Sequence, residues 1–186
     1  MLRTILKYGL IAGLVVGGFE LVTFTAFSGM PPLEYGMVIG YTTMLIALSA
    51  VFVGIKRHRD VDRGGVIGFW PALGIGLGIS FIAGIFYVAA WELVQAMTDM
   101  DFATSYSNAI LASEQAKGAS AEALAKLSAE MAAFKIQYAD PMFRLPMTFA
   151  EIFPVGVLVS LVSAGLLRNS RFLPVRRGST ANSAMK

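Results

Sequence analysis

Three glutamates, Glu20, Glu92 and Glu151, are the residues best placed to do chemistry, because each lies within or at the edge of a long apolar stretch. A carboxyl group in the apolar part of a bilayer is protonated, hydrated or paired with a cation. No Lys or Arg lies deep in these stretches, and Arg144 at an edge is the nearest candidate partner. The sequence therefore predicts a proton or cation site at Glu20 and Glu151, with Glu92 at its mouth. The structural alternative is a protonated glutamate hydrogen-bonded to a neighbouring helix, and for Glu92 it is simple solvation.

Other chemistries are excluded by residue types that the sequence lacks. The chain has no cysteine and one histidine, His58, which rules out thiolate sites, disulfides and two-histidine zinc motifs. We find no phosphate-binding loop and no Gly-x-Ser-x-Gly motif, and Ser160 and Ser163 have no histidine or embedded lysine to activate them. The sequence predicts no enzyme, no metal site and no cofactor. His58 lies in a charged loop, where we expect it to be solvated.

The elements that must position the glutamates are four membrane-spanning helices. Of the 186 residues, 56% are hydrophobic and 15% are charged, and the mean hydropathy is +0.66. About 20 apolar residues cross a bilayer as a helix, and four stretches reach this length, at about 4–27, 35–55, 71–92 and 146–167. We expect one all-α membrane domain over residues 1–170, followed by a basic tail at 171–186 that is disordered toward its end.

The distribution of Lys and Arg predicts the orientation of these helices. Basic residues dominate the N-terminal flank, the loop at 56–64 and the segment after 167, while most acids lie elsewhere. By the positive-inside rule, both termini and this loop are cytoplasmic, in a bacterial inner (plasma) membrane. The same distribution accounts for the sequence pI of about 9.3 without nucleic acid as a partner. Trp70 and Trp91 are expected to be interfacial anchors, and Glu20 argues against reading the first stretch as a cleaved signal peptide.

The segment between the third and fourth spans is predicted to be an extracytoplasmic pair of amphipathic helices over about 101–138. Asp101 and Ser120 are suited to N-cap positions, and Gly118 is suited to the left-handed position that ends the first helix. The second helix carries one apolar stripe: Leu124, Leu127, Met131, Phe134 and Tyr138. We expect the stripe to pack on the first helix and the bundle. The alternative is a docking face for a partner protein.

Glycines at four-residue spacing recur in the first three spans, where they let helix backbones approach closely. They are Gly9, Gly13, Gly17, Gly36, Gly40, Gly74 and Gly78. Their contacts can lie within one bundle or between protomers. At about 100° per residue, Glu20 falls on the ridge of the first three glycines, so we expect it to face another helix rather than lipid.

Several stretches of the sequence resemble one family. They are Ile-Gly-Tyr at 39–41, Gly-Ile-Lys-Arg at 54–57 with Arg-Asp at 59–60, Gly-Gly-Val-Ile-Gly-Phe at 64–69, Tyr-Val-Ala-Ala-Trp-Glu at 87–92, Asp-Phe at 101–102, and Phe-Arg-Leu-Pro-Met-Thr-Phe-Ala-Glu at 143–151. Together they resemble the bacterial membrane proteins grouped as domain of unknown function forty-one ninety-nine. The resemblance implies a four-helix protein of the bacterial inner membrane, and it supplies no activity.

Two functional hypotheses follow from the sequence. The first is a non-catalytic accessory or structural membrane subunit that acts through helix packing and its outer hairpin. The second is a small proton- or cation-coupled carrier, or an ion-binding protein, that uses the embedded glutamates. Both place the chain in the lipid bilayer, with a second copy of the chain or another membrane protein as the expected partner.

Overall fold

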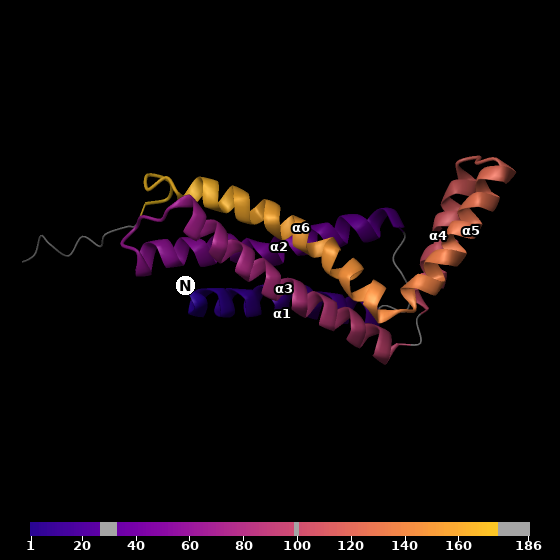
Figure 1. The fold of residues 1–186 in the computed structure, drawn as a ribbon, viewed down its shortest axis with the longest axis horizontal. Coiled ribbons are helices and arrows are strands. Elements are labelled where there is room, and N and C mark those ends of the chain that lie inside the picture. The colour runs from indigo at the N-terminus through magenta and orange to yellow at the C-terminus, as the bar shows by residue number, and fades with distance from the viewer. Residues whose placement is uncertain (27–32, 99–100, 175–186) are drawn as a thin grey trace, which may run out of the picture.

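The computed structural model describes residues 1–26, 33–98 and 101–174, and this part of the chain is helical without any strand. Its elements are α1 (Leu2–Ala26), α2 (Leu33–Arg57), the short π-helix η1 (His58–Asp62), α3 (Phe69–Met97), α4 (Phe102–Ala116), α5 (Ala121–Tyr138) and α6 (Pro141–Leu167). The four long helices, α1, α2, α3 and α6, form an elongated bundle, and α4 and α5 form a hairpin that extends beyond one end of it (Figure 1).

Each long helix of the bundle is long and apolar enough to cross a membrane, which confirms the four predicted stretches. The helices extend beyond the predicted bounds, because hydropathy marks the apolar part of a helix and not its caps. The clearest case is α6, which begins five residues before the predicted span. The side chain of Asp140 accepts a hydrogen bond from the backbone N–H of Met142, and Pro141 occupies the first turn, where its missing N–H costs nothing.

The central helix of the bundle is α3. It packs along α1 on one side and along α6 on the other, while α2 contacts all three. The apolar core contains Ala12, Leu48, Val51, Ile79 and Ile152, all of which are buried. We call the end that holds α4 and α5 the hairpin end. The opposite end, where α1 begins and α6 finishes, is the basic end.

The α2 helix leaves the core toward the hairpin end. Between residues 35 and 43 no side chain of α2 is buried, and Met44 is the first that is. Figure 1 shows this part of α2 diverging from α3 and α6. Among the described side chains, α2 therefore contributes to the core only from Met44 toward the basic end.

The hairpin has the helix caps and the turn that the sequence predicts. The side chains of Asp101 and Ser120 accept hydrogen bonds from Thr104 and Ala123 at the starts of α4 and α5. Gly118 has a φ of +81°, which a residue with a side chain rarely adopts. The apolar stripe of α5 is half-buried or buried along its length, and its Phe134 ring lies 5.9 Å from that of Tyr106 in α4. The side chains of the stripe are thus at least partly covered, and Phe134 packs against α4.

The loop at the basic end differs from its expected solvated form, because it continues α2 as the π-helix η1 and folds inward. His58 is only 4% exposed, so the expectation of a solvated histidine is wrong. Its Nδ1 lies 2.7 Å from an Asp62 oxygen and 3.5 Å from the hydroxyl of Thr4 in α1. Arg59 is fully buried beside it. The sequence indicates that this loop is charged. It does not indicate that a π-helix turns His58 and Arg59 toward the bundle.

Candidate functional site

The candidate site is a polar layer where the apolar core ends, and Glu20 is its deepest member. On α1, Tyr8, Ala12, Val16 and Glu20 follow one another at four-residue spacing and are all buried. Residues four apart lie on one face of a helix, so Glu20 extends the core-facing line of α1 by one turn. The Glu20 side chain faces other helices, as its position on the glycine ridge predicts.

Tyr87 of α3 and Glu151 of α6 complete this layer. Tyr87 lies one turn beyond Ala83 and two turns beyond Ile79, both of which are in the core. Its hydroxyl donates a hydrogen bond of 3.0 Å to the Oε2 atom of Glu151. The layer thus draws one phenol and two carboxyl groups from three helices, and a hydrogen bond joins the members from α3 and α6.

The two carboxyl groups are close enough for their charges to interact, although they come from opposite ends of the sequence. The Oε2 atom of Glu20 is buried and has no hydrogen-bond partner in the described structure. Within the described residues, no Lys, Arg or His forms an ion pair with Glu20 or Glu151. A buried polar atom without a partner is costly, and it is commonly found where a ligand or a proton binds.

Glu20 and Glu151 differ in accessibility. Glu20 is buried, whereas Glu151 is exposed and Tyr87 is half-buried. Glu151 therefore lies at the surface of the bundle, and the phenol of Tyr87 lies behind it. The layer combines a buried acid with an accessible one.

Glu92 does not belong to this layer, because it forms a bidentate ion pair with Arg144. The Nε and Nη2 atoms of Arg144 donate hydrogen bonds of 2.7 Å each to the two carboxylate oxygens of Glu92. Bidentate arginine–carboxylate pairs of this kind fix orientation strongly. Here the pair holds the start of α6 against the end of α3, so Glu92 is neither simply solvated nor unpaired.

A second polar group surrounds this ion pair at the base of the hairpin. Arg144 Nη1 donates a hydrogen bond to the backbone carbonyl of Tyr138, and the Trp91 indole donates one of 2.6 Å to the Tyr138 hydroxyl. Burial raises the pKa of Tyr138 to about 12, so its phenol stays protonated. Trp91 is only 6% exposed, so its expected role as an interfacial anchor is wrong, whereas Trp70 is 76% exposed.

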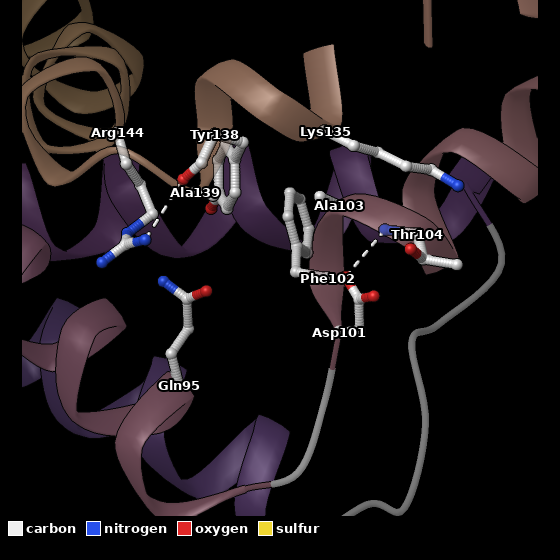
Figure 2. Close-up of a pocket in the computed structure, with 9 residues that line it drawn as sticks. All are labelled: Gln95, Asp101, Phe102, Ala103, Thr104, Lys135, Tyr138, Ala139 and Arg144. Carbon is white, nitrogen blue, oxygen red and sulfur yellow. Dashed lines mark hydrogen bonds between the residues drawn. The ribbon is translucent and has the colours of Figure 1, made fainter. Parts of the chain in front are cut away.

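A pocket lies beside this group, between the end of α3 and the hairpin (Figure 2). It is lined by Gln95, Asp101, Phe102, Ala103, Thr104, Lys135, Tyr138, Ala139 and Arg144. Two of its charged side chains already have partners, since Asp101 caps α4 and Arg144 holds Glu92. We interpret the pocket as part of the junction that joins the hairpin to the bundle.

The predicted glycine ridges lie in different surroundings. A side-chain carbon added at Gly9, Gly13 or Gly17 of α1 would come within about 3 Å of α3 side chains. Gly78 of α3 lies equally close to α1. Gly74 is less tight, because an added carbon would lie 3.5 Å from the end of the Met1 side chain.

On α2, Gly40 leaves room for a side chain, because an added carbon would meet nothing within 4 Å among the described residues. Gly36 and Gly40 are both half-buried. Gly84 and Gly156, which the sequence analysis did not single out, lie against Phe149 and Ser80 at the contact between α3 and α6.

Tyr87 is a site residue that sequence reasoning did not identify. Its signals are the four-residue spacing from Ile79 and Ala83, which indicates a core-facing position, and its place at the start of the family-like stretch 87–92. Its partner Glu151 is 64 positions away, and no local pattern connects the two. Among the described residues no group of three or more His, Cys, Asp or Glu side chains is placed to hold a metal ion.

Comparison with known proteins places the chain in a family. A family model described as "Protein of unknown function (DUF4199)" matches residues 7–169, which include nearly all of the four long helices and the whole hairpin. A search of curated proteins gives no match, and a search of solved structures gives none. The match confirms the resemblance seen in the sequence. The chain therefore belongs to the DUF4199 family of proteins of unknown function.

Proposed function

We propose that this chain is a small multi-pass membrane protein that binds a proton, or another single positive charge, between Glu20 and Glu151. The proposal places it in the bacterial inner membrane, with both termini in the cytoplasm and the hairpin outside. The observation that carries it is the buried Oε2 atom of Glu20, which has no hydrogen-bond partner among the described residues. The charge of Glu151 also acts on this carboxyl group. Ionisable residues inside a membrane are costly to place there and are functional candidates for that reason.

The charges around the two carboxyl groups favour one shared positive charge. Two carboxylates whose charges interact repel each other, so a proton bound by one of them, or a bound cation, stabilises the pair. The facing titratable groups are Tyr87 from α3 and, from the hairpin, Tyr138, whose phenol is within range of the Glu151 charge. The sequence of α2 has no acidic or basic residue between positions 35 and 55. Arg144 is already paired with Glu92.

Labelling with dicyclohexylcarbodiimide tests this proposal, because this apolar reagent reacts with protonated carboxyl groups in membranes. The full chain in lipid nanodiscs is treated, and the modified residues are mapped by mass spectrometry. We expect modification at Glu20 or Glu151, at a rate that falls as the pH rises and the proton leaves. Modification confined to other acids, or none at any pH, would show that the carboxyl pair holds no proton.

Matched variants locate the labelled site. Glu20→Gln and Glu151→Gln keep the shape of the side chain, and their combination is expected to abolish the fast labelling. Glu122→Gln changes an exposed acid of α5 and is expected to leave the labelling unchanged. Because the mapping is read on the unsubstituted chain, its result does not depend on whether a variant folds.

A second candidate function, an accessory subunit that binds another membrane protein, is supported by the surroundings of Gly40 on α2. Within the described residues, a carbon added at Gly40 would meet nothing within 4 Å, and the flanking Met37, Val38 and Tyr41 are exposed. A photo-crosslinking amino acid at Met37, in native membranes, is expected to give a protein adduct that the same group at the exposed, lipid-facing Leu158 does not give. Lipid adducts alone at both positions would count against this role.

A further inference from the structure

The charge of the polar layer is uncompensated, and this indicates the sign of any ligand. Glu20 and Glu151 form no ion pair within the described residues, and one oxygen of Glu20 is buried without a partner. Burial of an unpaired carboxylate is strongly unfavourable. A ligand that carries one positive charge would satisfy the layer, whereas an anionic ligand would add repulsion.

The layer is accessible from the side of the bundle. Glu151 is exposed, and α2 has no buried side chain between residues 35 and 43. Glu20 lies six residues before the end of α1, which places it about 9 Å along the helix from that end. At this depth, the exposed surface of an apolar bundle faces the hydrocarbon part of a bilayer. A ligand that is already dissolved in the membrane can therefore reach Glu151.

One aromatic side chain bonds to a carboxyl group of the layer, and another lies one helical turn from Glu20. Tyr87, which is half-buried, bonds directly to Glu151. Phe24, also half-buried, lies one turn beyond Glu20 on α1, and its ring packs edge-on to Trp91 with 5.2 Å between the ring centroids. Aromatic faces attract organic cations. A bare metal ion, in contrast, requires more oxygen ligands than two carboxyl groups and a phenol supply.

From these three observations we infer that the Glu20–Tyr87–Glu151 layer binds a lipophilic organic monocation, such as a membrane-soluble ammonium or phosphonium ion, which enters between α2 and α6. This inference rests on the proposed function, because the cation occupies the position of the shared proton. The exchange balances in charge, since one monocation replaces one proton that leaves the carboxyl pair. Cation binding therefore strengthens as the pH rises.

Tetraphenylphosphonium is the probe, and equilibrium dialysis of the full chain in nanodiscs measures its binding. We expect saturable binding of one probe ion per chain. The affinity for the probe should be higher at high pH. Glu20→Gln and Glu151→Gln are each expected to weaken it by roughly thirtyfold or more, because each removes one partner of a desolvated charge pair. Glu122→Gln is the matched control and is expected to bind as the unsubstituted chain does.

Tryptophan fluorescence supplies a second measurement, which reports whether the probe binds near Trp91. The sequence has two tryptophans, and Trp91 lies one turn from Tyr87 whereas Trp70 lies near the opposite end of α3. In a Trp70→Phe chain, the probe is expected to change the Trp91 emission at the concentrations at which it binds. Choline, a hydrophilic monocation that partitions poorly into lipid, is expected to leave the emission unchanged.

The outcomes separate this inference from the proposed function. The organic-cation site is overturned if probe binding is not saturable, or if both glutamine variants bind the probe as tightly as the unsubstituted chain does. If carbodiimide still modifies Glu20 or Glu151 in that case, the proton site stands alone. Protection of these residues from carbodiimide by the probe supports both proposals, and failure of both measurements removes both.

Discussion

Arg59 has the most consequential side chain at the basic end, because it is fully buried and joins two segments that are far apart in the sequence. Its guanidinium donates hydrogen bonds of 2.9 and 2.7 Å to the backbone carbonyls of Phe172 and Leu173, just after α6 ends. Its Nε atom also pairs with Asp60 at 2.7 Å. A cation at the C-terminus of a helix is favoured by the helix dipole. Arg59 thus fixes the end of α6 against the end of α2.

Replacement of Arg59 should therefore destabilise the bundle. We expect Arg59→Met to lower the free energy of unfolding by roughly 3 kcal/mol, because several charge-assisted hydrogen bonds are lost and carbonyl groups lose their donor. The exposed neighbour provides the control, since Arg57→Met should change stability by less than about 0.5 kcal/mol. Thermal unfolding of both variants in detergent measures the difference, and equal stabilities would show that Arg59 is not a structural tie.

Tyr87 and Glu151 show why the candidate site could not be read completely from single residues. Their types were visible in the sequence, and Glu151 was predicted as a site residue. The hydrogen bond between them depends on how α3 and α6 pack, which no local pattern encodes. Packing also decides the partner of Glu92. In the sequence Arg144 is a candidate partner for all three acids, and in the structure it pairs with Glu92.

At the scale of helices, the contact between α1 and α3 depends on the absence of side chains at the glycine ridge. A carbon added at Gly13 would lie 2.6 Å from the Cβ atom of Phe86, whereas one added at Gly18 would meet nothing within 4 Å. The two positions lie on the same helix and differ in what they face. They therefore form a matched pair for measuring how tightly the helices are packed.

We expect Gly13→Ala to destabilise the bundle by about 1–3 kcal/mol, because the added methyl group forces α1 and α3 apart. Gly18→Ala should be neutral or slightly stabilising, since alanine favours helix more than glycine does. Unfolding by increasing denaturing detergent in mixed micelles measures both variants. A Gly13→Ala chain as stable as Gly18→Ala would contradict close packing at this ridge.

The start of α4 should respond to pH through Asp101. Hydrogen bonds from the side chain and backbone of Thr104 hold the pKa of Asp101 below its usual range. Because the folded-state pKa is lower than the unfolded value of about 3.9, the cap stabilises α4 fully above that value. The stabilisation is lost as the pH falls through the lowered pKa.

Hydrogen exchange of the α4 amides in the full chain, corrected for the intrinsic pH dependence of exchange, measures this effect. Asp101→Ala should speed exchange at neutral pH by roughly fivefold, as expected from about 1 kcal/mol of lost capping. Asp101→Asn caps without titrating, so its exchange should lack the acid-dependent step. An acid-dependent step of equal size in Asp101→Asn would assign the pH response to another group.

At the scale of the whole molecule, the concentration of basic residues at one end predicts how the chain is threaded through the membrane. Arg168 and Arg171 are exposed there, whereas the hairpin at the other end carries both acids and lysines. The natural chain has no cysteine, so a single introduced cysteine reports its own position without background. Ser128 of α5 and Ser170 after α6 are both exposed and serve as a pair.

In intact cells, a membrane-impermeant maleimide is expected to label Ser128→Cys and to leave Ser170→Cys unlabelled until the membrane is opened. This result follows if Lys and Arg remain on the cytoplasmic side during insertion. Labelling of Ser170→Cys in intact cells would reverse the orientation. It would also place Glu20 and Glu151 in the cytoplasmic half of the bilayer, and the proton would then reach the site from the other side.

The sequence by itself determined the four long helices, the hairpin and its caps, and the acids that are candidates for function. Each of these depends on local quantities, namely the length of an apolar stretch, the residue at a helix terminus, or a charge in apolar surroundings. Only the tertiary structure decided that Tyr87 bonds to Glu151, that Arg144 pairs with Glu92, and that residues 35–43 of α2 lie outside the core. These features depend on which faces of the helices contact one another, and the packing of all the helices together determines those contacts.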